Sequence, residues 1–256
     1  MMTMSPLELG FSVFALVFFF AILGIILAPS LRRHHLNYSS KELFKAIRSI
    51  LIVLAAFSLG LLMTQAKGDF EKKKNEIKYQ SANIILMSRV LEDIGPKTEP
   101  SLAALREVVL NEIHQIDEAS QSRHNPAQAL TIARTERLRL ELLKLDARNP
   151  REEWLKNTAL NLAQQIVYSR WKIYSELNSN LEWPLVYILI FWLSVLFFNL
   201  GLTTPRHFVA IGGVSVGAIS VAAATYLVFQ LDMPYQGMIR ISPAPLQQAV
   251  HLIMVY

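Results

Sequence analysis

The sequence contains no cysteine, so it has no disulfide framework, no thiolate metal site and no thiol nucleophile. It has six histidines, but none stands in a metal-binding motif such as HExxH or at helical spacing from acidic partners. No nucleophile and base stand at a spacing that an enzyme would use. We therefore predict no catalytic residues, no metal and no cofactor, and expect that the protein is not an enzyme.

Charged residues are scarce as well. They make up 18% of the chain, against about a quarter of a typical soluble domain. The deficit is concentrated in four apolar blocks, which are residues 9–27, 49–66, 185–202 and 208–231. About 20 apolar residues are enough for a helix to cross a hydrocarbon core. The sequence therefore predicts an integral membrane protein with four spanning helices and the lipid bilayer as a partner.

The net charge of +5 could suggest a nucleic-acid partner. The basic residues, however, stand at the ends of the apolar blocks and are interleaved with acids between the second and third blocks. This distribution favours anchoring at lipid headgroups, so we expect no nucleic-acid partner.

No segment shows the alternation of apolar and polar residues that a half-buried strand needs, so we predict an all-α fold. The apolar blocks divide the chain into four parts. Residues 1–66 hold spans one and two, 67–182 form an inserted extramembrane helical bundle, 183–231 hold spans three and four, and 232–256 form a C-terminal interfacial segment. Its last helix is too short to span, and we expect it along the membrane interface or against the bundle.

The second span is predicted to continue out of the membrane as one helix over residues 44–94, roughly 75 Å long. Between Ala66 and Gly95 the only helix-weakening residue is Gly68. Apolar residues recur there every seven positions, at Phe70, Ile77, Ile84 and Leu91, which is typical of a buried helical stripe.

Three further amphipathic helices are predicted to complete the bundle, with starts near Ser101, Pro126 and Pro150. A polar loop is expected over residues 117–125. Asn149 and Glu152 have the spacing of a capping box, which places a helix start between them.

Small residues mark possible contact faces in two of the spans. Gly213 and Gly217 form a GxxxG face in the fourth span, and Ala56 and Gly60 form a similar notch in the second. We predict that these faces pack on another helix of the chain or on a neighbouring subunit.

Asp232 is the one acid at the inner edge of a span, where a carboxylate costs up to about 3 kcal/mol if it lies deep in the bilayer. We predict that it pairs with Arg240 across a turn formed by Pro234 and Gly237. The alternative is that Asp232 faces an ion pathway.

Five elements in the order of the chain carry a resemblance to a known family. They are His34-His35-Leu36 after the first span, the exit from the second span over 60–67, the run from Ser88-Arg89-Val90-Leu91 to Gly95-Pro96, the span 191–202 and the terminal stretch 230–246. In these elements the sequence resembles the bacterial bestrophin-like family of membrane proteins. Two positions depart from the family pattern, because Gln230 replaces the usual acid and Tyr235 replaces the commoner phenylalanine.

The resemblance implies kinship with bestrophin anion channels, which are oligomers whose pore is lined by a long second helix. We therefore expect a passive ion channel or channel-like assembly, homo-oligomeric, in the bacterial inner membrane. The pore-lining candidates in the second span are Leu54, Ala56, Gly60 and Leu61. The alternative is a non-conducting sensor or scaffold whose helical domain binds a partner.

Two arguments about sidedness disagree. Lys and Arg are concentrated between the first two spans and none precedes the first, so the positive-inside rule places residues 67–182 outside the cytoplasm. Kinship with bestrophins places them inside. We predict the outside location, in which a cysteine introduced at Ser120 reacts with a membrane-impermeant thiol reagent in intact cells. Protection of that cysteine until the cells are opened would contradict the prediction.

Overall fold

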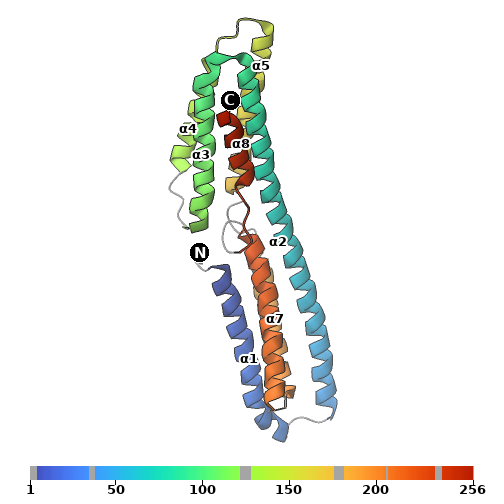
Figure 1. The fold of residues 1–256 in the computed structure, drawn as a ribbon. Helices are drawn as coiled ribbons and strands as arrows, with labels where there is room; N and C mark the ends of the chain where they lie inside the picture. Colours follow the sequence, from blue (N-terminus) through green and yellow to red (C-terminus); the bar gives the residue numbers. More distant parts are fainter. Residues whose placement is uncertain are drawn as a thin grey trace. The chain divides into compact units, whose positions relative to one another are not determined.

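The computed structural model describes residues 5–34, 38–121, 128–175, 182–205, 207–233 and 238–255, and every regular element in these ranges is a helix (Figure 1). In chain order the elements are α1 (Pro6–His34), α2 (Tyr38–Ile94), η1 (Pro96–Thr98), α3 (Glu99–Gln121), α4 (Gln128–Leu143), α5 (Pro150–Ser175), α6 (Trp183–Thr203), α7 (Phe208–Asp232) and α8 (Ala244–Val255). The all-α prediction is therefore confirmed. Helices α1, α2, α6 and α7 are long and apolar enough to cross a membrane, as the four apolar blocks predict.

The chain forms two compact units. The first comprises Met1–Phe70 and Asn180–Met238, and the second comprises Glu71–Ser179 and Ile239–Tyr256. The first unit thus holds the four spanning segments, and the second holds the outer part of α2 with α3, α4, α5 and α8.

In the first unit α1 packs along α6 and α7, and Figure 1 shows α1 beside α7. The contact with α6 is made by backbone against backbone. A Cβ atom added to Gly24 would overlap the carbonyl oxygen of Phe198 and lie 3.0 Å from the amide nitrogen of Leu202. A Cβ atom on Gly201 would overlap the Ala21 carbonyl in the same way. These two glycines therefore fix how closely the two helices approach.

The GxxxG residues of α7 do not make such a contact within the chain. A Cβ atom on Gly213 would meet nothing within 4 Å, and one on Gly217 would only touch the ring of Phe197, at 3.7 Å. Their packing on a neighbouring subunit stays a prediction. The crossing at Gly24 and Gly201 escaped the sequence analysis because these glycines lie in different spans and form no local motif.

Helix α2 is one unbroken helix of 57 residues, which confirms the predicted continuation beyond the membrane. It begins at Tyr38, six residues before the predicted start. The predicted stripe is buried: Ile77, Ile84 and Leu91 are each at most 1% exposed. Burying these side chains is what holds the outer half of α2 in the second unit.

The turn between α2 and α3 corrects the predicted start of α3, which is Glu99 rather than Ser101. Gly95 adopts a φ of 105°, a backbone conformation that favours glycine, and the 3-10 turn η1 follows. Thr98 donates its hydroxyl to the carbonyl oxygens of Leu91 and Gly95, at 2.8 Å each. This closed turn leads straight into α3, so the helix starts two residues early.

One other predicted boundary was wrong. Helix α3 continues to Gln121, into the stretch expected to be loop, because Glu, Ala and Gln there are good helix formers. Helix α4 ends at Leu143 and so stops before Pro150. The predicted start of α4 at Asn125-Pro126 lies outside the described residues.

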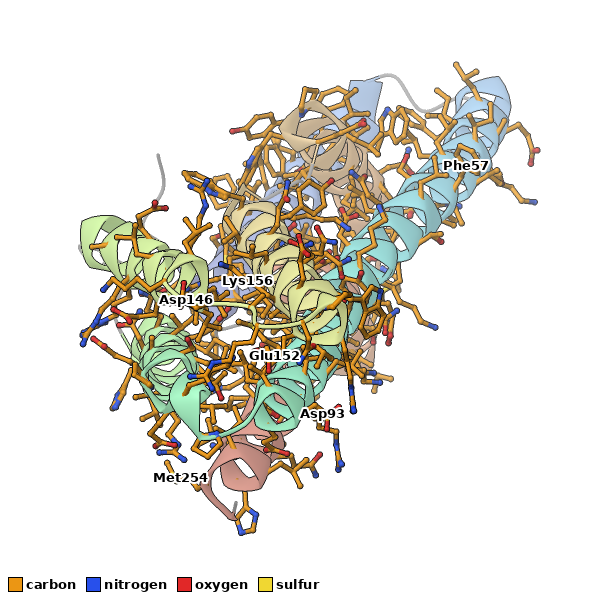
Figure 2. The ribbon with its side chains drawn as sticks, turned by 90° about the horizontal axis from the view of Figure 1, so that it is seen from above. Phe57, Asp93, Asp146, Glu152, Lys156 and Met254 are labelled. Carbon is orange, nitrogen blue, oxygen red and sulfur yellow. The ribbon has the colours of Figure 1, made fainter. Side chains whose placement is uncertain are left out.

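Lysines hold the connection between α4 and α5. Lys156 donates to the carbonyl oxygens of Leu143 and Leu145, at 3.0 and 2.6 Å, and Lys97 binds the Asp146 carbonyl oxygen at 2.8 Å and the Glu152 carboxylate. Figure 2 shows Asp146, Glu152 and Lys156 gathered here. The hydrogen bond from Lys97, followed by one from the Arg148 amide, lowers the pKa of the Glu152 carboxyl.

The predicted capping box at the start of α5 is confirmed. The Glu152 amide donates to Asn149 Oδ1 at 2.8 Å, and the Arg148 amide donates to the Glu152 carboxylate at 3.1 Å.

At the other end of the chain, α8 lies beside α3 (Figure 1), and the Arg106 guanidinium donates to the Ile253 carbonyl oxygen at 2.8 Å. The C-terminal helix thus packs against a bundle helix.

The glycine crossing generates a stability prediction. Gly201→Leu forces a side chain into the backbone of α1, so it should destabilise the first unit by about 3 kcal/mol or more. Gly212→Leu is the matched control, because its added Cβ atom meets nothing within 4 Å and Gly212 is not part of the predicted GxxxG face. The melting temperature in detergent should fall for Gly201→Leu alone. Equal melting temperatures for the two variants would show that the crossing does not hold the fold.

Candidate pore-lining face of α2

The membrane part of α2 packs on the first unit through one face only. The buried positions recur at helical spacing and are Leu51, Ala55, Ser58, Leu62 and Ala66. On the opposite side of the helix the side chains are exposed, with Val53 and Phe57 about two-thirds exposed, at 67% and 66%, whereas Leu59 and Met63 are partly buried. The second span therefore has a face that no described part of the chain covers.

The four pore-lining candidates all lie on this uncovered part of α2. Leu54 and Leu61 are 36% and 46% exposed, whereas Leu62, the next residue, is 1% exposed. Ala56 and Gly60 are exposed, and a Cβ atom on Gly60 would meet nothing within 4 Å. The structure thus leaves the predicted residues open, and their lining of a pore stays a prediction.

A row of cations continues the Ala56 side of this face beyond the membrane. Lys67, Lys78 and Arg89 follow Ala56 at steps of eleven residues, which is close to three turns of an α-helix, and α2 is unbroken throughout. All three cations are exposed. The sequence analysis missed this row, although the eleven-residue spacing is visible in the sequence.

Two of the acids near this row are engaged elsewhere, whereas Glu92 and Asp93 beside Arg89 are exposed. Glu71 forms an ion pair with Lys74 at 3.4 Å, and Glu76 forms one with Lys172 of α5 at 2.8 Å. Among the described residues, Lys67, Lys78 and Arg89 have no ion-pair partner. The exposed face of α2 is therefore apolar in the span, with small residues at Ala56 and Gly60, and it carries the cation row beyond the span.

The other predicted site lies at the end of α7. Asp232 is buried, at 3% exposed, and Arg240 is exposed, while Pro234 and Gly237 lie outside the described residues. The pairing of Asp232 with Arg240 stays a prediction. Gln230 accepts hydrogen bonds on Oε1 from the Tyr226 hydroxyl at 2.9 Å and the Met238 amide at 3.2 Å.

Four helices long and apolar enough to span a membrane, together with a second, all-helical unit, indicate a helical membrane protein. The chain belongs to the bestrophin-like family, because the model of the Bestrophin-like domain matches residues 15–246.

Solved structures agree with this assignment at the level of the fold. Two variants of a bacterial bestrophin homologue from Klebsiella pneumoniae superpose with TM-scores of 0.68 and 0.64. Each is 14% identical and covers 96% of this chain, over 98% and 97% of its own length. A structure described as a membrane protein gives a TM-score of 0.64, with 14% identity over 96% of this chain and 97% of its own. No curated protein matches the sequence.

Proposed function

We propose that the protein is a passive ion channel of the bacterial inner membrane, formed by several copies of the chain around a pore lined by α2. The observation that carries the proposal is the uncovered face of α2, which is small and apolar at Ala56 and Gly60. One copy cannot enclose a path with a single helix face, so a ring of α2 helices is needed. Such a ring forms a narrow apolar constriction, and constrictions of this kind gate by dewetting.

The cation row supports anions as the permeating class. Lys67, Lys78 and Arg89 would line the continuation of the path at intervals of about 16 Å in every subunit. Clefts lined by charge of one sign concentrate counter-ions, by about tenfold or more. The proposed lining therefore attracts small anions and repels cations. It offers no group for covalent chemistry, and we propose no enzymatic activity.

A non-conducting sensor or scaffold is the competing function. It would use the same exposed residues as a docking surface for a partner protein, and it would pass no current. Current recordings from the purified protein in planar bilayers therefore separate the two functions.

The constriction predicts a difference between two adjacent leucines. Leu61→Ser places a hydroxyl on the uncovered face and should raise conductance, because a polar side chain lowers the cost of water in an apolar constriction. Leu62→Ser makes the same chemical change on the buried face and should lower stability without raising conductance. Equal conductance in the two variants, or no current in any variant, would contradict the proposed pore.

The cation row predicts a loss of selectivity. Replacing Lys67, Lys78 and Arg89 together by Gln should lower the anion-to-cation permeability ratio by about tenfold, measured as a shift of reversal potential in a salt gradient. Lys144→Gln, just after the end of α4, removes an exposed cation that pairs with Glu141; it is the control and should leave the ratio unchanged. An unchanged ratio in the triple variant would place the ion path elsewhere.

A further inference from the structure

The second unit encloses a buried polar cluster. Its members come from four helices, and the three at its centre are buried: Gln80 of α2, Glu112 of α3 and Arg170 of α5, at 0%, 6% and 9% exposed. The same interior holds many aliphatic side chains, which include Ile77, Ile84, Leu105, Val109, Leu138 and Ile166. A buried ion pair is a poor source of stability, since desolvating the charges offsets their attraction. The cluster therefore calls for another role.

Both partners of Glu112 converge on one carboxylate oxygen. Gln80 Nε2 donates to Glu112 Oε2 at 2.6 Å, and Arg170 Nε lies 3.5 Å from the same oxygen. The Arg170 guanidinium also donates to the Thr135 hydroxyl of α4, at 3.2 Å. Gln80 Oε1 is buried and accepts no hydrogen bond from the described residues. One acceptor of the cluster, Gln80 Oε1, thus lacks a donor among the described residues.

The other charged groups named here on the surrounding helices have partners of their own or are exposed. On α4, Arg134 binds Glu107 and Asn111, and Arg137 binds Glu107. On α2, Lys73 is buried two turns before Gln80 and has an interaction of its own. On α8 the one titratable side chain is His251, which is exposed. Arg170 is thus the one cation within ion-pair distance of Glu112 among the described residues.

Burial raises the pKa of the Glu112 carboxyl above its ordinary value, and the opposing effects of Arg170 and Gln80 are smaller. The native protein therefore holds this proton more tightly than the unfolded chain does. The stability of the second unit rises as the pH falls through the raised pKa, and this gain disappears as the pH rises through it again.

Protonation turns Glu112 from an acceptor of hydrogen bonds into a donor. The new Glu112 hydroxyl can donate to Gln80 Oε1 once the Gln80 amide has turned over, and Arg170 then loses its anion and keeps Thr135. The network thus has two arrangements, one for each charge state of Glu112, with opposite ends of the Gln80 amide facing the carboxyl group. The two arrangements differ in the hydrogen bond between Gln80 of α2 and Glu112 of α3, and in the ion pair between Glu112 and Arg170 of α5.

We propose that Glu112, Gln80 and Arg170 form a proton-operated switch that sets the conductance by changing how α2 is held by α3 and α5. The coupling to conductance rests on the proposed channel function. The switch itself concerns only contacts within the second unit.

The test is the pH dependence of current in planar bilayers, from neutral to mildly acidic pH. The parent protein should change its open fraction with pH. Glu112→Gln fixes the neutral state with little change of shape, so its open fraction should stay at the acid value throughout. Glu107→Gln removes a half-exposed acid from the same helix and should keep the parent response. A Glu112→Gln variant that responds to pH as the parent does, or a parent that does not respond, would overturn the switch.

Two further measurements test the proton switch independently of the proposed channel function. The unfolding midpoint of the parent in detergent should rise at mildly acidic pH relative to that of Glu112→Gln, whether or not current flows. Parallel profiles of unfolding midpoint against pH in the two proteins would overturn the switch even in a conducting protein.

If Glu112→Gln does not fold, Gln80→Met serves instead. It removes the hydrogen bond that favours the anion, so the midpoint of the pH response should move to higher pH, and an unmoved midpoint would count against the switch. Absence of current in all variants would contradict the proposed channel alone.

Discussion

Backbone hydrogen bonding is the constraint on which this structure depends. In hydrocarbon each N–H and C=O must be paired within the segment, and an α-helix achieves this without a neighbour. In α2 nothing interrupts that pattern after the membrane, so the helix continues and buries Ile77, Ile84 and Leu91 among the helices of the second unit. Helix α2 thus supplies a candidate membrane span and part of the core of the second unit. Its two halves differ in side chains and share one backbone.

The two units are stabilised by different means. In the first, helix α1 and helix α6 approach until their backbones touch at Gly24 and Gly201, as is suitable where lipid tails compete for every apolar contact. In the second, long aliphatic side chains such as Ile77, Ile84 and Leu91 are buried among the helices, and this burial supplies the driving force. The second unit can therefore accommodate a buried polar cluster, because the surrounding core outweighs what the cluster costs.

How far the sequence predicted the structure depended on whether the deciding forces were local. The four spans, the continuity of α2 and the capping box at Asn149 follow from runs, periods and short motifs, and all were predicted. The contact of Gly24 with Gly201 was not, because it joins residues 177 positions apart that form no common pattern. The GxxxG motif at Gly213 drew attention to the wrong glycines within the chain for the same reason. Leu54, Ala56, Gly60 and Leu61 were chosen from size alone, and burial then separated Leu61 from Leu62, which size could not do.

The connection between α4 and α5 has a chemical consequence of its own. The carbonyl groups of Leu143, Leu145 and Asp146, at and just after the end of α4, are bound by the ammonium groups of Lys97 and Lys156 rather than by a glycine cap. This corner of the bundle therefore depends on two amines that carry a positive charge. Acylation of these amines would remove both the charge and most of the donors, and it would leave the last carbonyls of α4 to water. Reaction of these two amines should thus disrupt the connection between α4 and α5 while the aliphatic core of the second unit stays folded.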